Sequence, residues 1–470
     1  MNDRSNKPLG SLDLWALGFG AIIGWGWVAM GSYWIGTAGI LGTIIMLVLI
    51  CGLMMLISLC YSELTSAMPR AGGPQNFAWR AFGPKMAFVA AWISLFAPVT
   101  FMSWMDNAAI SALDYVFNFS SSPLLYTVAG CEVHLASLIV YEILGLGMII
   151  IGLLGINVVS KVQNIGVIGM IIVVIVFIGA AFTKGNSANL QPTMPNGMSG
   201  MFAILLTSIT FLCGFECVSN AIEDSHVSYK SVGKIIFWVM VASAAWLIFT
   251  QLATNLAMPY ADVCNSSLSA FDAMSALFGG AKWTTYIMLV VGLLGIVTSW
   301  IACSINSSTY SYNMARTGML PEWFTKTSGK YGTPTRLIII VGIIMELLGF
   351  LGGAVNVLFA STAGFFINIS YAIVCIDFIL LRKKEPEMNR PYKTKLWVGY
   401  AALAVCILLL VLSLPGMPSA LSKTGFIVSL VWIALGVIVY FCYAGKKERL
   451  ELVDKNMKAL FANTNTTEEK

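Results

Sequence analysis

Long uncharged stretches recur along the whole chain. The first runs from Leu14 to Ser62 without an Asp, Glu, Lys or Arg, and a helix needs about 20 mostly apolar residues to cross a bilayer. Polar and basic segments separate such stretches. The pattern predicts twelve membrane-spanning helices over residues 9–36, 40–67, 86–116, 135–156, 158–183, 198–222, 233–258, 283–315, 336–355, 357–381, 396–414 and 424–444.

Glycines interrupt two of these spans. Residues 18–26 read GFGAIIGWG and residues 210–216 read TFLCGFE. Backbone N–H and C=O groups without helical partners are tolerated at membrane depth only where they face protein or a water-filled cavity. Interrupted segments in corresponding positions of two halves are the best sequence indication of a transporter's binding site. The sequence therefore predicts a transporter.

The two interrupted spans each begin one half of the chain. Five spans precede the polar, turn-rich segment 184–197, five follow it, and two more complete the chain. An odd number of spans per half places the halves in opposite orientations, as in inverted-repeat transporters. The expected organisation is an N-terminal segment 1–8, a first repeat 9–183, a second repeat 198–382, two further spans within 396–444 and a tail 445–470.

Composition and charge support the same organisation. Apolar residues make up 58% of the chain and charged residues 10%, where a soluble protein has about 25% charged residues. With the N-terminus in the cytoplasm, all but three of the 27 Lys and Arg lie on that side, the exceptions being Lys184, Lys282 and Lys423. Basic loops stay cytoplasmic. We therefore expect a multi-pass protein of the lipid bilayer of the cytoplasmic membrane with both termini inside, and no nucleic-acid partner.

The short segments between the spans carry recognisable motifs. YSELTSAMPRAGGP at 61–74 precedes RAFGP at 80–84, ARTGMLP at 315–321 precedes YGTP at 331–334, and RKKEP at 382–386 leads to RPY at 390–392. In this order, and together with the two helix breaks, these motifs resemble the amino acid–polyamine–organocation (APC) superfamily over roughly residues 9–445. The resemblance implies an all-α integral membrane protein of the leucine-transporter type, with a 5+5 inverted repeat, two extra helices, and helices 1 and 6 interrupted.

The broken helices predict how a substrate binds. At each break the first half ends in free carbonyls and the second half begins with free N–H groups and the positive end of the helix dipole. We expect the amides at 24–26 to bind a carboxylate and the carbonyls near 21–23, 210 and 213 to bind an ammonium group, as the resemblance also implies. The alternative is that these glycines only permit close helix packing. The expected substrate-binding residues are Ile23, Gly24, Trp25, Gly26, Thr210, Cys213 and Gly214.

Trp25 departs from the family pattern, which usually has a small residue there. Its ring either narrows the pocket, offers a π-face to a cation, or turns away into helix packing. The first two possibilities favour small amino acids or amines.

Glu216 and Asp106 lie inside predicted spans, where ionisable groups are rare and usually functional. Glu216 follows the second break, and its expected role is a proton relay, a gate or a structural brace. Asp106, the other candidate for gating or proton transfer, has no counterpart in the resemblance. We expect it to reach the extracellular interface, the alternative being attraction of a cationic substrate.

The sequence is compatible with more than one way of coupling transport to an energy source. The lysine that many proton-coupled relatives carry on the fifth helix is replaced here by Met170. Related folds that use sodium place a hydroxyl pair beside first-helix carbonyls, so the resemblance implies that Thr298 and Ser299, with the carbonyl of Ala21, could bind sodium. Such hydroxyls more often bond to their own helix. Proton coupling through Glu216, or exchange without a coupling ion, is the alternative.

Other classes of protein fit less well. The spans hold no convergent cluster of nucleophile, base or metal ligands, so no enzyme, cofactor or metal is expected. No filter-like repeat or ring of charge indicates a channel, whereas a receptor with this fold would have the same sequence features. Cys131 and Cys264 lie in expected outer loops, where they could form a disulfide. We expect a secondary active transporter that moves a small amino acid by alternating access. The alternatives are an amine, polyamine or ethanolamine-type permease, or an exchanger.

Overall fold

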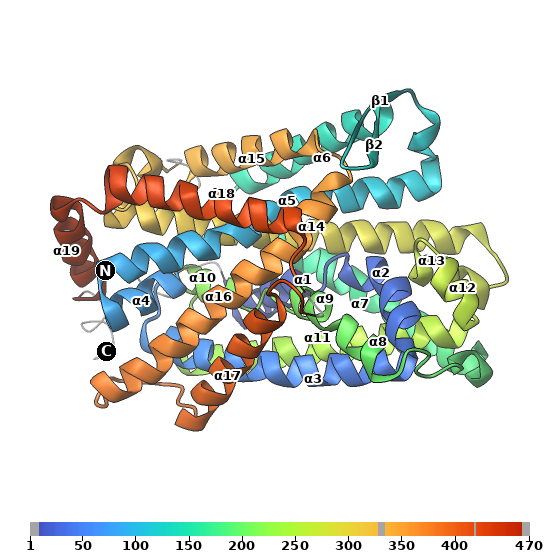
Figure 1. Cartoon of the computed structure of the whole chain (residues 1–470), viewed down its shortest axis with the longest axis horizontal. Coiled ribbons are helices and arrows are strands. Elements are labelled where there is room, and N and C mark those ends of the chain that lie inside the picture. The colour runs from blue at the N-terminus through green and yellow to red at the C-terminus, as the bar shows by residue number, and fades with distance from the viewer. Residues whose placement is uncertain (1–8, 328–333, 418–419, 463–470) are drawn as a thin grey trace.

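Long helices run side by side along the longest axis of the molecule (Figure 1). The computed structural model describes residues 9–327, 334–417 and 420–462. The α-helices are α1 Ser11–Ile22, α2 Gly26–Ala29, α3 Gly31–Ala67, α4 Pro74–Phe82, α5 Pro84–Phe117, α6 Leu135–Leu153, α7 Ile156–Lys184, α8 Gly197–Ala203, α9 Leu205–Thr210, α10 Glu216–Asn220, α11 Tyr229–Ala257, α12 Tyr260–Asn265, α13 Ser269–Leu277, α14 Lys282–Thr317, α15 Thr335–Gly349, α16 Ala354–Lys384, α17 Leu396–Leu412, α18 Lys423–Val439 and α19 Lys447–Ala462. Short helical turns are Phe119–Ser121, Ser187–Leu190, Ile222–Asp224, Glu322–Thr325 and Tyr440–Ala444.

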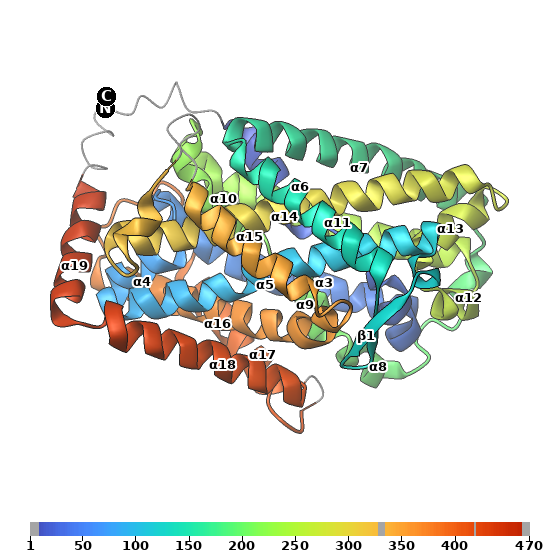
Figure 2. The same cartoon turned by 90° about the horizontal axis from the view of Figure 1, so that it is seen from above.

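The two ends of the bundle differ. One end carries α4 and α19, and the other carries α12, α13 and a β-hairpin (Figure 1). We call them the α4 end and the hairpin end. In the second view α7 and α18 lie at opposite edges of the bundle (Figure 2). The expected segments 1–8, Tyr331–Thr333 and 463–470 lie outside the described residues.

Many helices are long and apolar enough to cross a membrane. Within the described ranges nine meet this criterion, and Gly197–Thr210 and Leu396–Leu412 are shorter apolar helices. Large apolar side chains on α6, α7 and α18 face outward, among them Ile143, Ile165 and Leu430, as they would toward lipid. The protein is therefore an integral, multi-pass membrane protein. The count of twelve spans and the 5+5 repeat stay predictions.

The boundary expected between the first two spans lies inside α3. Gly39 has φ +70° and ψ 171°, which interrupts the helical backbone. A Cβ at this position would lie 2.2 Å from the carbonyl oxygen of Thr193, so the close approach of the 193–195 loop also requires glycine. The predicted gap at 37–39 is thus a sharp glycine kink between two helical segments.

The fold is mostly helical, as expected, and one connection between helices forms a short hairpin. Strands β1 Leu124–Val128 and β2 Cys131–His134 form an antiparallel hairpin. Ala129 and Gly130 both have positive φ, as a two-residue hairpin turn requires. The sequence pattern missed it because these strands are shorter than the apolar spans around them.

The expected outer cysteines do not pair. Cys131 lies beside Gly353, whereas Cys264 lies beside Gly36, and both thiols are free. The two residues belong to different parts of the hairpin end.

Several sequence motifs meet in an ion-pair network at the α4 end. The Glu63 carboxylate is buried and lies 2.6 Å from Arg382 Nε and 3.1 Å from Arg390 Nε. The backbone N–H of Thr394 donates to the same carboxylate at 2.7 Å. One buried acid therefore joins the end of α3 to the α16–α17 connection. Glu223 pairs in a similar way with Arg316 at 3.1 Å.

Removing one member of this buried network should be costly, because it leaves charged partners buried without compensation. We expect Glu63→Gln to lower the free energy of unfolding by about 3–5 kcal/mol. The exposed pair of Glu385 with Arg80 is a matched control, and Glu385→Gln should cost at most about 1 kcal/mol. Thermal unfolding of both purified variants in detergent measures the difference. Equal stability of the two would contradict a structural role for Glu63.

Candidate functional site

The two interrupted helices meet at the centre of the bundle. Gly214, with φ +129°, packs so closely on α1 that a Cβ there would lie 2.8 Å from the Ala21 carbonyl carbon and 3.0 Å from the Ile22 nitrogen. A side chain would push the helices apart, and positive φ also favours glycine. The second break therefore rests directly against the first.

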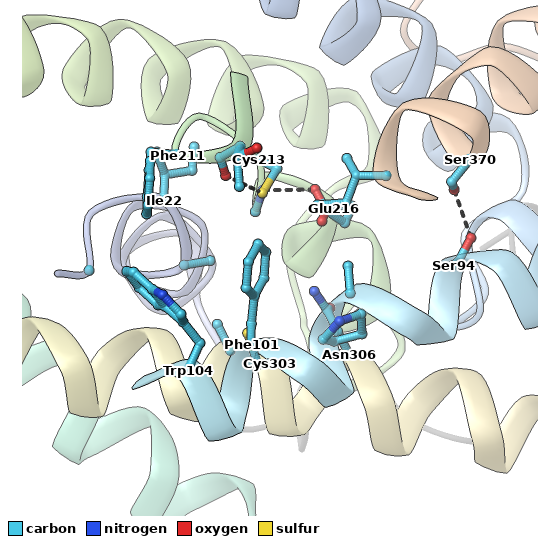
Figure 3. Close-up of a pocket in the computed structure, with 18 of the residues that line it drawn as sticks. Ile22, Ser94, Phe101, Trp104, Phe211, Cys213, Glu216, Cys303, Asn306 and Ser370 are labelled. Atoms are coloured by element: carbon cyan, nitrogen blue, oxygen red, sulfur yellow. Dashed lines mark hydrogen bonds between the residues drawn. The ribbon is translucent and has the colours of Figure 1, made fainter. Parts of the chain in front are cut away.

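A cavity of about 50 Å³ lies where the breaks meet (Figure 3). We call it the break cavity. It is lined from α1, α2, α3, α5, α9, α10, α14 and α16, by residues that include Ala21, Ile22, Gly24, Trp25, Gly26, Tyr61, Ser94, Phe101, Trp104, Thr210, Phe211, Cys213, Gly214, Glu216, Cys303, Asn306, Tyr310, Ser370 and Tyr371. A buried water needs roughly 10–15 Å³ of such volume, so the cavity has room for only a few waters.

The first break exposes backbone donors. α1 ends at Ile22, and the Ile23 N–H still donates to the Phe19 carbonyl at 2.7 Å. Among the described residues, the N–H groups at 24–26 have no backbone acceptor. They follow the pattern of a helix start, which leaves N–H groups unsatisfied. These donors stand at the cavity wall, where an anionic group of a ligand can accept from them.

The second break is organised by Glu216. The Gly214 N–H donates to Glu216 Oε2 at 3.0 Å, and the Tyr371 hydroxyl donates to the same oxygen at 3.0 Å. The Cys213 thiol donates to the Thr210 carbonyl at 2.9 Å. Glu216 points toward the cavity from the start of α10 (Figure 3). The carboxylate thus braces the break and at the same time gives the cavity its charge.

Glu216 is the only carboxyl group among the described residues that line the cavity, and this set includes no Lys, Arg or His. An anionic ligand would meet uncompensated repulsion from Glu216. A zwitterion or a cation has a partner for its positive group. The electrostatics therefore favour ligands that carry an ammonium group.

Aromatic rings close the cavity toward the hairpin end. Phe211 covers Gly26, where a Cβ would lie 2.3 Å from its ring. Its centroid is 5.4 Å from that of Trp104 and 6.1 Å from that of Trp34. The Trp34 indole N–H donates to the Thr207 hydroxyl at 3.0 Å, which ties this layer to α9.

A second aromatic layer lies toward the α4 end. The Tyr61 ring is 5.3 Å from Phe215 and 5.7 Å from Tyr371, measured between centroids, and Phe215 stacks on Tyr371 at 5.4 Å. Ser94 and Ser370 share a hydrogen bond of 2.7 Å in the same region (Figure 3). The cavity lies between two layers of rings, neither of which the sequence pattern indicated.

Trp25 fills space beside the cavity. Its ring packs on Gly292 of α14, where a Cβ would come within 2.5 Å, and lies 6.0 Å from the Phe271 ring. The indole ring therefore packs mainly against neighbouring helices, while Trp25 still lines part of the break cavity. Ile23, in contrast, is fully buried and lies outside the residues that line the cavity.

Thr298 and Ser299, the hydroxyl pair expected near a sodium ion, lie on α14 next to the first break. The Ser299 hydroxyl donates to the Gly20 carbonyl at 2.7 Å, and the Thr298 hydroxyl donates to Gly295 of its own helix at 3.0 Å. Met170 lies beside Gly295, where a Cβ would be 3.2 Å from its sulfur. A sodium site formed with Ala21 stays a prediction.

Sequence reasoning missed Gln163 of α7. Its amide nitrogen donates to the Ala16 carbonyl at 3.1 Å and lies where a side chain on Gly20 would be. Its oxygen is buried without a hydrogen-bond partner among the described residues. The sequence did contain a signal for this contact, namely an amide side chain inside an otherwise apolar span. Gln163 therefore holds α1 to α7 just before the break.

The expectation that Asp106 reaches the extracellular interface is wrong. Its side chain is 2% exposed, because α6 and α15 cover this face of α5 with Tyr141 and Glu346. Asp106 also lies outside the wall of the break cavity, although Trp104 and Met105 belong to it.

Comparison with known proteins agrees with this architecture. The family model described as "Amino acid permease" matches residues 9–441. The chain is 27% identical to the branched-chain amino acid permease BcaP of Bacillus subtilis, over 94% of each protein. It is also 27% identical to the methylthioribose transporter of that organism, over 94% of this chain and 95% of the relative. The chain is 24% identical to the glutamate/serine transporter AimA of B. subtilis, over 94% of this chain and 83% of the relative.

A side chain at Gly26 should destroy the first break as a binding surface. In Gly26→Leu the new atoms would overlap Phe211 and displace the amides from the cavity. We expect loss of ligand-induced thermal stabilisation while the protein still inserts and purifies as a monodisperse species. Gly52→Leu is the control, since Gly52 has nothing within 4 Å of a Cβ. Full ligand response in Gly26→Leu would show that the substrate binds elsewhere.

Proposed function

Since the chain belongs to the amino acid permease family of the APC superfamily, we propose that it moves a small amino acid across the cell membrane by alternating access. The observation that carries the proposal is the break cavity. It combines free N–H groups at 24–26, carbonyls of the opposing half-helices, and the Glu216 carboxylate. An α-amino acid has an anionic group and a cationic group a short distance apart. The donors at 24–26 suit its carboxylate, and the carbonyls and Glu216 suit its ammonium group.

The size limit comes from the rings around the cavity. Phe211 and Trp104 close it on one side, Tyr61 and Tyr371 on the other, and Trp25 narrows its wall. With about 50 Å³ of free volume, a large side chain would require these rings to move. This supports a small amino acid. The names of the three relatives cover branched-chain amino acids, glutamate or serine, and methylthioribose, so similarity alone does not select among them.

An amine is the second candidate substrate. Glu216 supplies a negative charge without a basic side chain to balance it among the described lining residues, and several ring faces border the cavity. Cations bind to such faces. A simple amine, a polyamine or an ethanolamine-type compound would use Glu216 and leave the donors at 24–26 without an anionic partner. This unused donor set makes the amino acid the better fit.

Alternating access assigns a gate to each aromatic layer. We infer that Phe211, Trp104 and Trp34 close the route to the outside, and that Tyr61, Phe215 and Tyr371 close the route to the cytoplasm. The basic loops at the α4 end support a cytoplasmic location of that end and of both termini. Opening one layer while the other stays packed would expose the break cavity to one side at a time. Coupling through Glu216, through a sodium ion near Ala21, Thr298 and Ser299, or by exchange alone are the routes to test.

Uptake into proteoliposomes tests the substrate class. A mixed pool of amino acids and amines is offered with a proton gradient, with a sodium gradient, or with preloaded vesicles only, and the contents are read by mass spectrometry. We expect one or a few small neutral amino acids to accumulate. Accumulation of amines alone would select the second candidate. Ligand-induced thermal stabilisation without any movement would indicate a receptor instead.

Glu216→Gln tests the role of the cavity charge. The variant keeps an acceptor for the Gly214 N–H but loses the negative charge. Because a hydrogen bond to a charged group contributes about 1.5–3 kcal/mol, we expect apparent affinity to fall by about tenfold or more. Glu322→Gln, an exposed site far from the cavity, is the control. Wild-type affinity and an unchanged pH profile of uptake would remove Glu216 from both binding and proton transfer.

A further inference from the structure

A second group of ionisable side chains lies outside the break cavity. Asp106 of α5, Glu142 of α6 and Glu346 of α15 come together where these three helices run side by side in both views (Figures 1 and 2). The Glu142 and Glu346 carboxyl groups face one another, and Asp106 faces both. We call these three residues the carboxyl cluster.

Helix packing positions the cluster. Gly145 of α6 forms a notch for Glu346, since a Cβ there would lie 2.2 Å from Glu346 Oε1. Gly349 of α15 forms a similar notch for the Tyr141 ring, since a Cβ there would lie 2.1 Å from Tyr141 Cε1. The Tyr141 hydroxyl contacts Ser103 Oγ at 2.8 Å and donates to the Met345 carbonyl at 3.1 Å. The carboxyl groups are therefore held by complementary surfaces of three helices.

The acids in the cluster lack basic partners. Asp106 is 2% exposed, and its Oδ2 has no hydrogen-bond donor among the described residues. Both carboxyl oxygens of Glu346 and Oε1 of Glu142 are likewise buried without a hydrogen-bond donor among the described residues. Within the described ranges no ion pair joins any of the three to Lys, Arg or His. The other titratable group that faces them is the Tyr141 phenol.

Protons are the ligands that such a cluster requires. An ionised carboxylate that is buried without a partner costs several kcal/mol, and adjacent like charges add repulsion. Two carboxylates have only acceptor oxygens, so Glu142 and Glu346 can hydrogen-bond to one another only when one of them carries a proton. A second negative charge would add repulsion to the cost of the first, so the cluster holds one negative charge at most, and one more proton neutralises it.

Polar space separate from the break cavity adjoins the cluster at Trp300. A second cavity, of about 230 Å³, lies toward the α4 end and is lined by polar residues that include Ser304, Ser308 and Asn313. Trp300 belongs to the wall of this cavity and its indole also faces Asp106. A polar cavity of this size has room for several waters, and Trp300 is the residue that separates it from Asp106.

We propose that the carboxyl cluster is a proton-binding site that couples substrate movement to a proton gradient, an inference that rests on the proposed transport function. Binding one proton converts one carboxylate to a carboxylic acid and changes the cluster from one negative charge to none. Release restores the charge. Asp106 lies two residues from Trp104 on α5, so a change in how α5 packs on α6 and α15 reaches the ring layer of the break cavity directly.

The test compares Asp106→Asn and Glu346→Gln with Asp114→Asn, which makes the same change on the same helix outside the cluster. Substrate exchange between preloaded vesicles and medium measures folding and the binding site. Accumulation driven by an inward proton gradient measures coupling. We expect Asp106→Asn and Glu346→Gln to exchange substrate within about twofold of wild type but to accumulate no more with the gradient than without it. Asp114→Asn should resemble wild type in both assays.

Infrared difference spectra between acid and alkaline pH provide a second readout that does not depend on transport. Wild type should show a protonated-carboxyl band that shrinks in Asp106→Asn and in Glu346→Gln and is unchanged in Asp114→Asn. Proton-driven accumulation by both cluster variants at wild-type level would overturn the inference, as would a wild type that exchanges substrate but never uses the gradient. Absence of exchange by wild type for every amino acid and amine tested would instead overturn the proposed function.

Discussion

Polar backbone at membrane depth must have partners, and the rest of this structure depends on that constraint. α1 and the α9–α10 segment both lose their helical hydrogen bonds at the centre of the bundle. Each break is tolerated because it faces the other, with Gly214 in contact with the backbone of Ala21. Groups that remain free then line a cavity, which is the arrangement in which a ligand supplies what the protein leaves unsatisfied.

Supporting contacts hold the breaks in place from outside. Ser299 donates to the Gly20 carbonyl and Gln163 to the Ala16 carbonyl, so α14 and α7 fix the first half of α1. Glu216 fixes the second break through Gly214 and Tyr371. The same carboxylate therefore serves structure and electrostatics. A brace that also carries the charge of the cavity links substrate binding to the geometry of α10.

Ionisable residues fall into two environments with different consequences. At the α4 end, Glu63 and Glu223 are paired with arginines, so their charges are compensated and tie loops to helices. Deeper in the bundle, Glu216 and the carboxyl cluster have no basic partner among the described residues. Uncompensated acids inside a membrane protein are costly and usually functional, and here they occur at the break cavity and between α5, α6 and α15.

The sequence by itself determined the class of protein, most span positions and both helix breaks. Spacing of charges and glycine interruptions are local properties, so Gly24, Gly26, Gly214 and Glu216, which line the break cavity, could be placed at the helix breaks without coordinates. Tertiary structure alone decided what covers each helix face. It turned Trp25 into helix packing, buried Asp106 under α6 and α15, brought Gln163 to α1, and placed aromatic layers on both sides of the cavity. The physical reason is that apolar spans have no amphipathic pattern that distinguishes a face toward lipid from a face toward another helix.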